Sequence, residues 1–195
     1  PAFPYGVKAM KVDVLICPSD PNARQRLSTT GNPEHFPLNY AANLGTYFVY
    51  DPVSGRFGDG AFGPNSATRP ASFQDGMSNT LGMSEVKAYT PYSRNASMPL
   101  TLNETVPADL TAACAVMAGA SQNQQNSGHT EWADGRAHHV GFTTVFTPNT
   151  KVNCTNGAFG VQDMDYNSQR EDNPEGTTNP TYAIVTSRSH HTGMV

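Results

Sequence analysis

The sequence predicts an α+β fold, with an antiparallel sheet, one short helix and long loops between them. Several short stretches have apolar residues that alternate or run together, as in 181–186, and such stretches are typical of strands. Only the segment 105–119 places its apolar residues at helical spacing. Glycine (17) and proline (15) are frequent among the 195 residues, and only 14% of residues are charged. This composition favours a loop-rich domain that contains β-structure.

Strands are expected where apolar residues repeat with a period of two or form a short run. The clearest alternation is Val12, Val14 and Ile16 in the segment 11–17, and 38–50 has weaker strand character. The other predicted strands are 81–89, 140–146 and 181–186. The segments expected to be loops are 21–37 and 51–70, which are punctuated by proline and glycine, the polar 122–128 and the acidic, turn-rich 162–180. Asp75-Gly76 predicts a tight turn, with Gly76 available for a positive φ.

The predicted helix has recognisable signals at both ends. Thr105 can cap it, Pro107 suits its first turn, and Asp109 favours the positive end of the helix dipole. Gly119 can end it. The apolar face consists of Leu110, Ala113, Cys114 and Met117, at positions i, i+3, i+4 and i+7.

Composition and motifs argue against several function classes. The length of 195 residues fits one domain over 1–195, and the net charge of −4 comes with no basic patch, so no nucleic-acid partner is expected. No apolar stretch approaches the ~18 residues that span a membrane. The chain has no Gly-x-Ser-x-Gly elbow, phosphate-binding loop or dinucleotide motif, so we expect a non-enzymatic protein that requires no cofactor. Ser189 beside His190-His191 is a poor nucleophile and base pair, because adjacent residues seldom have that geometry.

The three cysteines lack CxxC spacing, which argues against a zinc knuckle or a thioredoxin-like site. One disulfide plus one buried thiol fits an oxidising compartment, and Cys114–Cys154 is the favoured pair. Cys17 could also pair, and three buried free thiols are the alternative.

Two clusters invite a metal interpretation. His129, Glu131, Asp134, His138 and His139 lie within eleven residues, but without a known metal-binding spacing they are interpreted as turn and surface polar groups. The second cluster follows the spacing of a calcium loop: Asp163, Asp165 and Asn167 take positions 1, 3 and 5, and Glu171 takes position 9. Ser168 and Pro174 break that pattern, so a calcium site is a secondary hypothesis and a solvated acidic loop is the main one.

Several motifs, taken in order, resemble one family. They include Asp75-Gly76-Met77-Ser78-Asn79, Trp132-Ala133-Asp134-Gly135 and the segment from Ser187 to Gly193 with His191. Further matches are 15–20, 39–45, 59–62, 141–149 and Cys154. Together they resemble the large planctomycete family of prepilin-like proteins of unknown function, which is also catalogued as a bacterial solute-binding family. The family-motif residues are Asp75, Gly76, Ser78, Asn79, Trp132, Asp134, Gly135 and His191.

The resemblance implies a pilin- or pseudopilin-like globular head outside the cytoplasm. Family members carry an N-terminal spine helix, absent from this chain, and end with a His, nine residues and Asp-Gly. His191 fits that His, so the chain is expected to be trimmed at both ends, with any membrane contact made through the missing helix. His190-His191-Thr192 departs from the family's single His followed by Pro-Gly. Loss of the spine helix would expose an apolar sheet face unless the chain has enough core of its own.

Two functions follow as expectations. The first is a structural subunit of a bacterial surface or periplasmic filament or secretion assembly, with protein partners that are copies of itself or other pilin-like subunits. The second is an extracytoplasmic module that binds a small solute or a glycan. Its pocket would be built from the long loops and lined by aromatics among Tyr47, Tyr50, Phe57, Tyr89, Tyr92 and Trp132.

Overall fold

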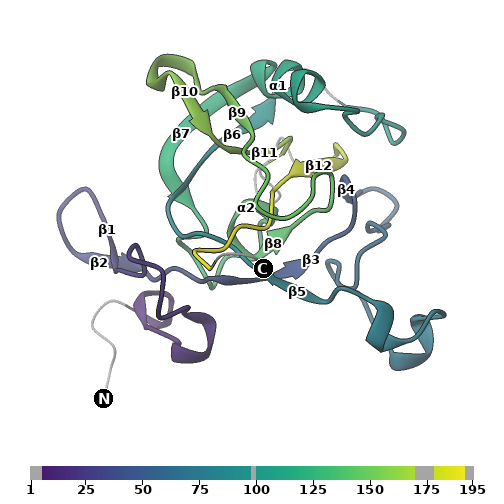
Figure 1. Cartoon of the computed structure of the whole chain (residues 1–195), viewed down its shortest axis with the longest axis horizontal. Helices are drawn as coiled ribbons and strands as arrows, with labels where there is room; N and C mark the ends of the chain where they lie inside the picture. Colours follow the sequence, from purple (N-terminus) through teal and green to yellow (C-terminus); the bar gives the residue numbers. More distant parts are fainter. Residues whose placement is uncertain (1–5, 98–99, 170–177, 192–195) are drawn as a thin grey trace.

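A mixed five-stranded sheet lies at the centre of the computed structural model, which describes residues 6–97, 100–169 and 178–191. Its order is β4 (Phe48–Tyr50), β12 (Thr181–Ile184), β11 (Asp165–Asn167), β6 (Thr90–Ala96) and β7 (Ala120–Gly128) (Figure 1). β11 pairs with β6 in parallel, and the other neighbours are antiparallel. The α+β prediction is confirmed.

Smaller sheets flank the central one. A three-stranded sheet has the order β5 (Met83–Glu85), β3 (Tyr40–Asn43) and β8 (Gly141–Phe142). Two further pairs are β1 (Arg26–Leu27) with β2 (Pro33–His35), and β9 (Asn153–Thr155) with β10 (Val161–Asp163). Short helical turns are η1 (Val7–Ala9), η2 (Asp13–Leu15), η3 (Pro70–Ser72), η4 (Met77–Asn79), η5 (Gly157–Phe159) and the one-turn α2 (Ala137–Val140).

Strand β12 shows that the central sheet is covered on both faces. Tyr182 and Ile184 belong to one buried cluster, whereas Ala183 and the following Val185 belong to another. Successive side chains of a strand point to opposite faces, so the two clusters lie on opposite sides of this sheet. The chain therefore has core of its own on both faces of this sheet.

Helix α1 (Leu110–Ala118) covers one of these faces together with β9 (Figure 1). The predicted apolar face is partly confirmed, because Ala113 and Met117 are buried whereas Leu110 is 41% exposed. The helix begins later than expected: Asp109 is its N-cap and accepts a hydrogen bond from Ala112 N at 2.8 Å. Gly119 ends it as predicted.

The predicted disulfide is confirmed between Cys114 of α1 and Cys154 of β9. The disulfide links the helix covalently to the β9–β10 pair, in addition to the apolar contact between α1 and β9. Cys17 is a free, buried thiol.

Several segments differ from their predicted structures. The expected loop 21–37 contains the β1–β2 pair, and the expected loop 162–180 contains β11 and most of β10. Residues 11–17 do not form a strand: Leu15 N donates to Val12 O and Ile16 N to Asp13 O, so local bonds of η2 replace those of a sheet. Val14 is consequently 80% exposed. The polar segment 122–128 belongs to strand β7, which pairs with β6 along most of its length. The sequence did not predict this strand, because much of β7 faces solvent and its residues show no apolar alternation.

Among the described residues, no helix is long and apolar enough to cross a membrane.

Candidate binding cleft

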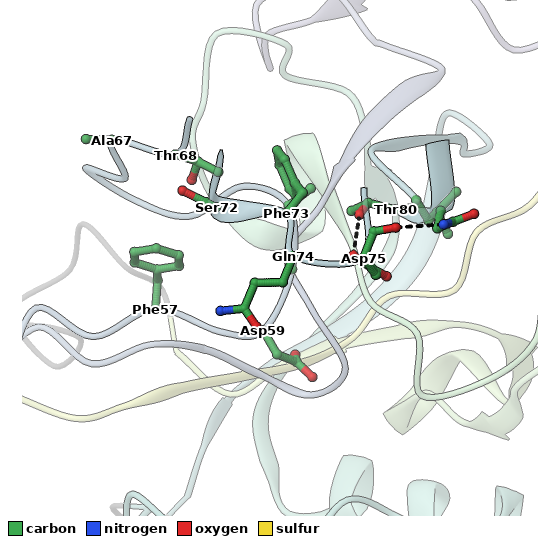
Figure 2. A pocket seen from close by; sticks show the side chains of 13 residues that line it. Phe57, Asp59, Ala67, Thr68, Ser72, Phe73, Gln74, Asp75 and Thr80 are labelled. Atoms are coloured by element: carbon green, nitrogen blue, oxygen red, sulfur yellow. Dashed lines mark hydrogen bonds between the residues drawn. The ribbon is translucent and has the colours of Figure 1, made fainter. Parts of the chain in front are cut away.

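A cleft of about 710 Å³ opens between two loop segments that precede β5. Residues 57–61 form one wall and residues 67–81 form the other. Figure 2 shows Gln74 reaching from the second wall towards the segment that carries Asp59, with the Phe57 ring to one side. The cleft therefore combines aromatic rings with amide and carboxylate groups.

Two glycines hold the first wall against the backbone of residues 44–48. A Cβ on Gly58 would lie 2.2 Å from Phe48 O, and one on Gly60 would lie 2.2 Å from Gly45 N. No other residue type fits this close an approach without displacing one of the two backbone segments. The position of this wall is thus fixed by backbone contact.

Asp59 uses its carboxylate mainly to anchor this wall. Its Oδ1 accepts a hydrogen bond from Thr46 N at 2.6 Å, and its Oδ2 accepts one from Thr46 Oγ1 at 2.8 Å. A ligand would therefore meet an Asp59 whose orientation is already set.

Hydrogen bonds within its own turn stabilise the second wall. Gly76 has φ +89°, as the predicted turn requires, and its N–H donates to Phe73 O at 3.0 Å. Asn79 Nδ2 donates to Asp75 O at 2.6 Å, and Thr80 Oγ1 donates to Asp75 Oδ1 at 3.4 Å. The exposed side chain of Gln74 extends into the cleft, whereas the Asp75 carboxylate lies next to Thr80 (Figure 2).

An apolar groove of about 320 Å³ adjoins the cleft. Phe73 and Thr80 line both hollows, and the groove adds Phe62, Pro70 and Met77. Phe62 is 45% exposed and Met77 61% exposed. A ligand in the cleft could extend an apolar part into this groove.

The predicted aromatic lining is only partly assembled. Phe57 lines the cleft, and Tyr47 lines a smaller hollow on the other side of the Phe57–Asp59 segment. Tyr50 lies at a separate hollow, and Tyr92 is buried. The expectation missed Phe73, which lines the cleft together with Phe57 only because of tertiary contacts.

Tyr89 and Trp132 also lie away from the cleft. The Tyr89 hydroxyl donates to Arg24 O at 3.1 Å, and the Arg24 guanidinium lies over its ring. Trp132 packs against the core, and its indole N–H donates to Met10 O at 2.9 Å.

The family-motif residues come to three separate places. Asp75 and Asn79 line the cleft, next to Gly76 and the exposed Ser78 of η4. Asp134 instead accepts from Arg136 Nη1 at 2.6 Å, in the turn of Trp132 and Gly135. His191 lies near Cys17 and Glu85, with its Nε2 3.4 Å from Cys17 Sγ.

The histidine cluster is buried, so its interpretation as surface polar groups is wrong. His129, His138 and His139 are at most 1% exposed. The His138 ring stacks on Tyr92 at 4.3 Å, and His129 Nδ1–H donates to His139 O at 2.9 Å. These rings lie where α2 meets β11, a contact that the local sequence does not reveal.

Glu131 connects this cluster to the β1–β2 pair. Its carboxylate pairs with Arg26 and lies 3.4 Å from both His35 Nε2 and His139 Nε2. Burial lowers the pKa of His139 well below its usual 6.5, and neighbouring positive charge adds to this. Burial also lowers the pKa of His35, with Lys8 and Arg26 contributing. Both imidazoles are therefore neutral at neutral pH.

The three described residues of the calcium hypothesis lie on two strands and not in one loop. Asp163 ends β10 and Asp165 begins β11, and both carboxylates bind the buried Arg188. Asn167 ends β11, and Glu171 lies outside the described residues. A guanidinium between Asp163 and Asp165 supplies the positive charge that a calcium ion would bring, which argues against calcium at these two carboxylates.

No curated protein and no solved structure is significantly similar to this chain. A family profile described as protein of unknown function (DUF1559), which carries a bacterial solute-binding label, matches residues 2–195. The match extends over nearly the whole chain, including both walls of the cleft, the histidine cluster and the segment with His191. The chain therefore belongs to this family of unknown function with a bacterial solute-binding label.

Proposed function

We propose that this chain is a non-enzymatic, extracytoplasmic module that binds a neutral, hydroxyl-rich solute of the glycan class in the cleft between residues 57–61 and 67–81. The proposal depends on one observation: two aromatic rings and several polar groups line the same cleft, whose walls are held in place by backbone contacts and hydrogen bonds. Phe57 and Phe73 offer apolar ring surface, while Gln74 and Asp75 offer donors and acceptors. Sugars present both an apolar face and hydroxyl groups, so this combination suits them.

The cleft is a pre-formed site, because contacts within the chain already fix both of its walls. The close approach of Gly58 and Gly60 fixes one wall, and the Asp75–Asn79 hydrogen bond fixes the other. A pre-formed site loses less conformational entropy when a ligand binds. The Cys114–Cys154 disulfide supports the extracytoplasmic location, because disulfides persist in oxidising compartments.

The test is binding of the purified chain to an array of soluble oligosaccharides, followed by calorimetry on the hits. Gln74→Ala and Phe57→Ala should each weaken binding roughly 3- to 10-fold, or about 0.7–1.4 kcal/mol, as expected for one lost hydrogen bond or ring contact. Val161→Ala is the matched control, because Val161 is 71% exposed on β10 and does not line the cleft. Equal affinity of all three variants would refute the proposed site.

The second candidate is the pilin-like structural subunit. The α+β architecture around a mostly antiparallel sheet favours it. Both faces of that sheet are covered by the chain itself, so a spine helix would have to dock elsewhere, and this makes the binding module the stronger candidate. The full-length gene product distinguishes the two: a prepilin-type leader upstream predicts a filament subunit, and a lipoprotein or secretory signal predicts a binding protein.

A further inference from the structure

Three segments that are far apart in the sequence bring a thiol, a carboxylate and an imidazole together. Cys17 follows η2, Glu85 ends β5, and His191 lies in the segment after β12. Cys17 Sγ lies 3.4 Å from His191 Nε2, and that nitrogen lies 3.7 Å from Glu85 Oε1. All three atoms lie within 4.8 Å of one another.

These separations match the edges of a tetrahedral metal site. Zinc bonds of about 2.3 Å to sulfur and about 2.0–2.2 Å to nitrogen or oxygen place neighbouring tetrahedral ligands about 3.4–3.6 Å apart. The measured Cys17–His191 and His191–Glu85 distances of 3.4 and 3.7 Å agree with that spacing. A cation could therefore enter without a large movement of the ligands.

Hydrogen bonds to neighbouring groups hold the ligands in place. Cys17 N donates to Asn39 Oδ1 at 3.0 Å, which fixes the backbone of the thiol. Ser189 Oγ donates to Glu85 Oε2, and His191 N donates to the same Ser189 oxygen at 2.8 Å. Ser189 thus orients both the carboxylate and the histidine, as outer partners commonly do at metal sites.

We propose that Cys17, Glu85 and His191 form a binding site for a thiophilic divalent cation of the zinc class. A thiolate with an imidazole selects such cations over calcium or magnesium, which prefer oxygen ligands only. Binding converts the Cys17 thiol to a thiolate and releases its proton to the buffer, so the charge of the thiolate and Glu85 balances the dication. The fourth position remains for water, and His191, whose side chain is 43% exposed, leaves a route of entry.

A second cluster of potential ligands carries no such proposal. Glu131, Asp134 and His139 also lie within 4.8 Å of one another. There, however, Arg26 pairs with Glu131 and Arg136 pairs with Asp134. These cations occupy the carboxylates and would repel a metal ion.

Cobalt(II) is the probe that separates a metal site from a simple thiol–imidazole hydrogen bond. Titration of the metal-free chain, with its disulfide intact and Cys17 as a free thiol, should produce a thiolate-to-cobalt charge-transfer band and the intense visible bands of a tetrahedral ion. Zinc should then displace cobalt and abolish these bands. Because the other two cysteines form the disulfide, Cys17 is the one thiol available among the three.

Variants assign the ligands. Cys17→Ser should remove the charge-transfer band, and His191→Ala and Glu85→Gln should each weaken zinc binding at least about 10-fold, since even outer partners of a metal cost 10–100-fold. The matched control is His190→Gln, because His190 is the neighbouring histidine but lies 3.3 Å from Asp20 instead. It should leave the zinc affinity within about 2-fold of wild type, a change well under 1 kcal/mol.

A second measurement uses the unmodified chain and does not depend on how the variants fold. Zinc should slow alkylation of Cys17 by iodoacetamide at least about 10-fold, because a metal-bound thiolate is a poorer nucleophile than a free one. The proposal is overturned if cobalt gives no charge-transfer band, if zinc does not protect the thiol, or if His190→Gln weakens binding as much as His191→Ala. Rapid alkylation that zinc leaves unchanged would point to a reactive thiol instead.

Discussion

The buried guanidinium of Arg188 should be the most sensitive single point of this fold. Its side chain is 4% exposed. Nε and Nη2 donate to the two oxygens of Asp163 at 3.2 and 2.9 Å, and Nη1 donates to Asp165 Oδ1 at 2.6 Å. Nη1 also donates to Thr186 O at 3.0 Å. Arg188 therefore joins the C-terminal segment to both β10 and β11.

Arg188→Met keeps the length of the side chain but removes every donor. Asp165, which is 1% exposed, would keep a hydrogen bond from Thr186 N at 3.1 Å and the His129 ring 3.7 Å away. Breaking a buried ion pair from one side costs about 3–5 kcal/mol, because a buried charge is left uncompensated. We expect a loss of that size in the free energy of unfolding. Arg188→Lys keeps the charge without the planar fork and should cost less, about 1–3 kcal/mol.

The pH dependence of this loss gives an independent check. Burial pushes the pKa of Asp165 up, but Arg188 and His129 outweigh burial, so its pKa lies below the ordinary 3.8. The stabilisation is thus present above pH ~4 and is lost as pH falls through the lowered pKa. Without Arg188 the pKa of Asp165 should rise, so the carboxyl can take up a proton. The cost of Arg188→Met should therefore shrink on acidification from neutral pH towards pH 4.

Denaturant unfolding followed by the fluorescence of Trp132, the one tryptophan, measures these losses. Arg56→Met is the control, because Arg56 is exposed and should cost under ~1 kcal/mol. Asp165→Asn combined with Arg188→Met should recover part of the loss, since it removes the orphaned charge. A loss for Arg188→Met no larger than that of Arg56→Met, or one that does not change with pH, would refute this reasoning.

The remaining predictions concern pH, a close backbone approach and the disulfide. Burial lowers the pKa values of His35 and His139, so the unfolded chain binds protons below pH ~6.5 that the native state does not bind, and stability should fall as the pH decreases. The slope should be at most about 1.4 kcal/mol per pH unit for the buried His139, and His139→Gln should flatten a urea-unfolding series across pH 7–5. Gly60→Ala would place a Cβ 2.2 Å from a backbone nitrogen and should lower thermal stability by about 1–3 kcal/mol; an unchanged melting temperature would contradict the close approach. Replacing Cys114 and Cys154 by alanine opens a loop with a sequence separation of 40 and should cost about 4 kcal/mol, to be measured by denaturant unfolding against the oxidised parent.

Local sequence signals were sufficient to predict an element where its structure depends on residues within one short segment. The spacing of Ala113 and Met117 predicts α1, and Gly119 ends it where predicted. The run 181–186 predicts a strand and contains β12 (Thr181–Ile184). The turn at Gly76 follows from the need for a positive φ.

Predictions failed where a partner in space decides the structure. The alternating residues 11–17 found no neighbouring strand, so local hydrogen bonds formed η2 instead. The polar segment 120–128 became β7 because β6 offers it a ladder of backbone hydrogen bonds, which does not depend on side-chain polarity. Apolar alternation predicts a strand only when one face of the segment is buried. Segment 11–17 alternates but is not buried in a sheet, and β7 is a strand without apolar alternation.

The sequence by itself determined the family, the α+β class, helix α1 and the favoured disulfide pair. These depend on residue types at short spacing, or on motifs whose order along the chain is enough. Only the tertiary structure decided that the predicted acidic loop residues Asp163 and Asp165 bind Arg188, that the histidines are buried, and that Phe73 faces the cleft. It also brought Cys17 within 3.4 Å of His191, across a separation of 174 residues. Long-range contacts of this kind follow from the packing of whole elements, so no local pattern of residues encodes them.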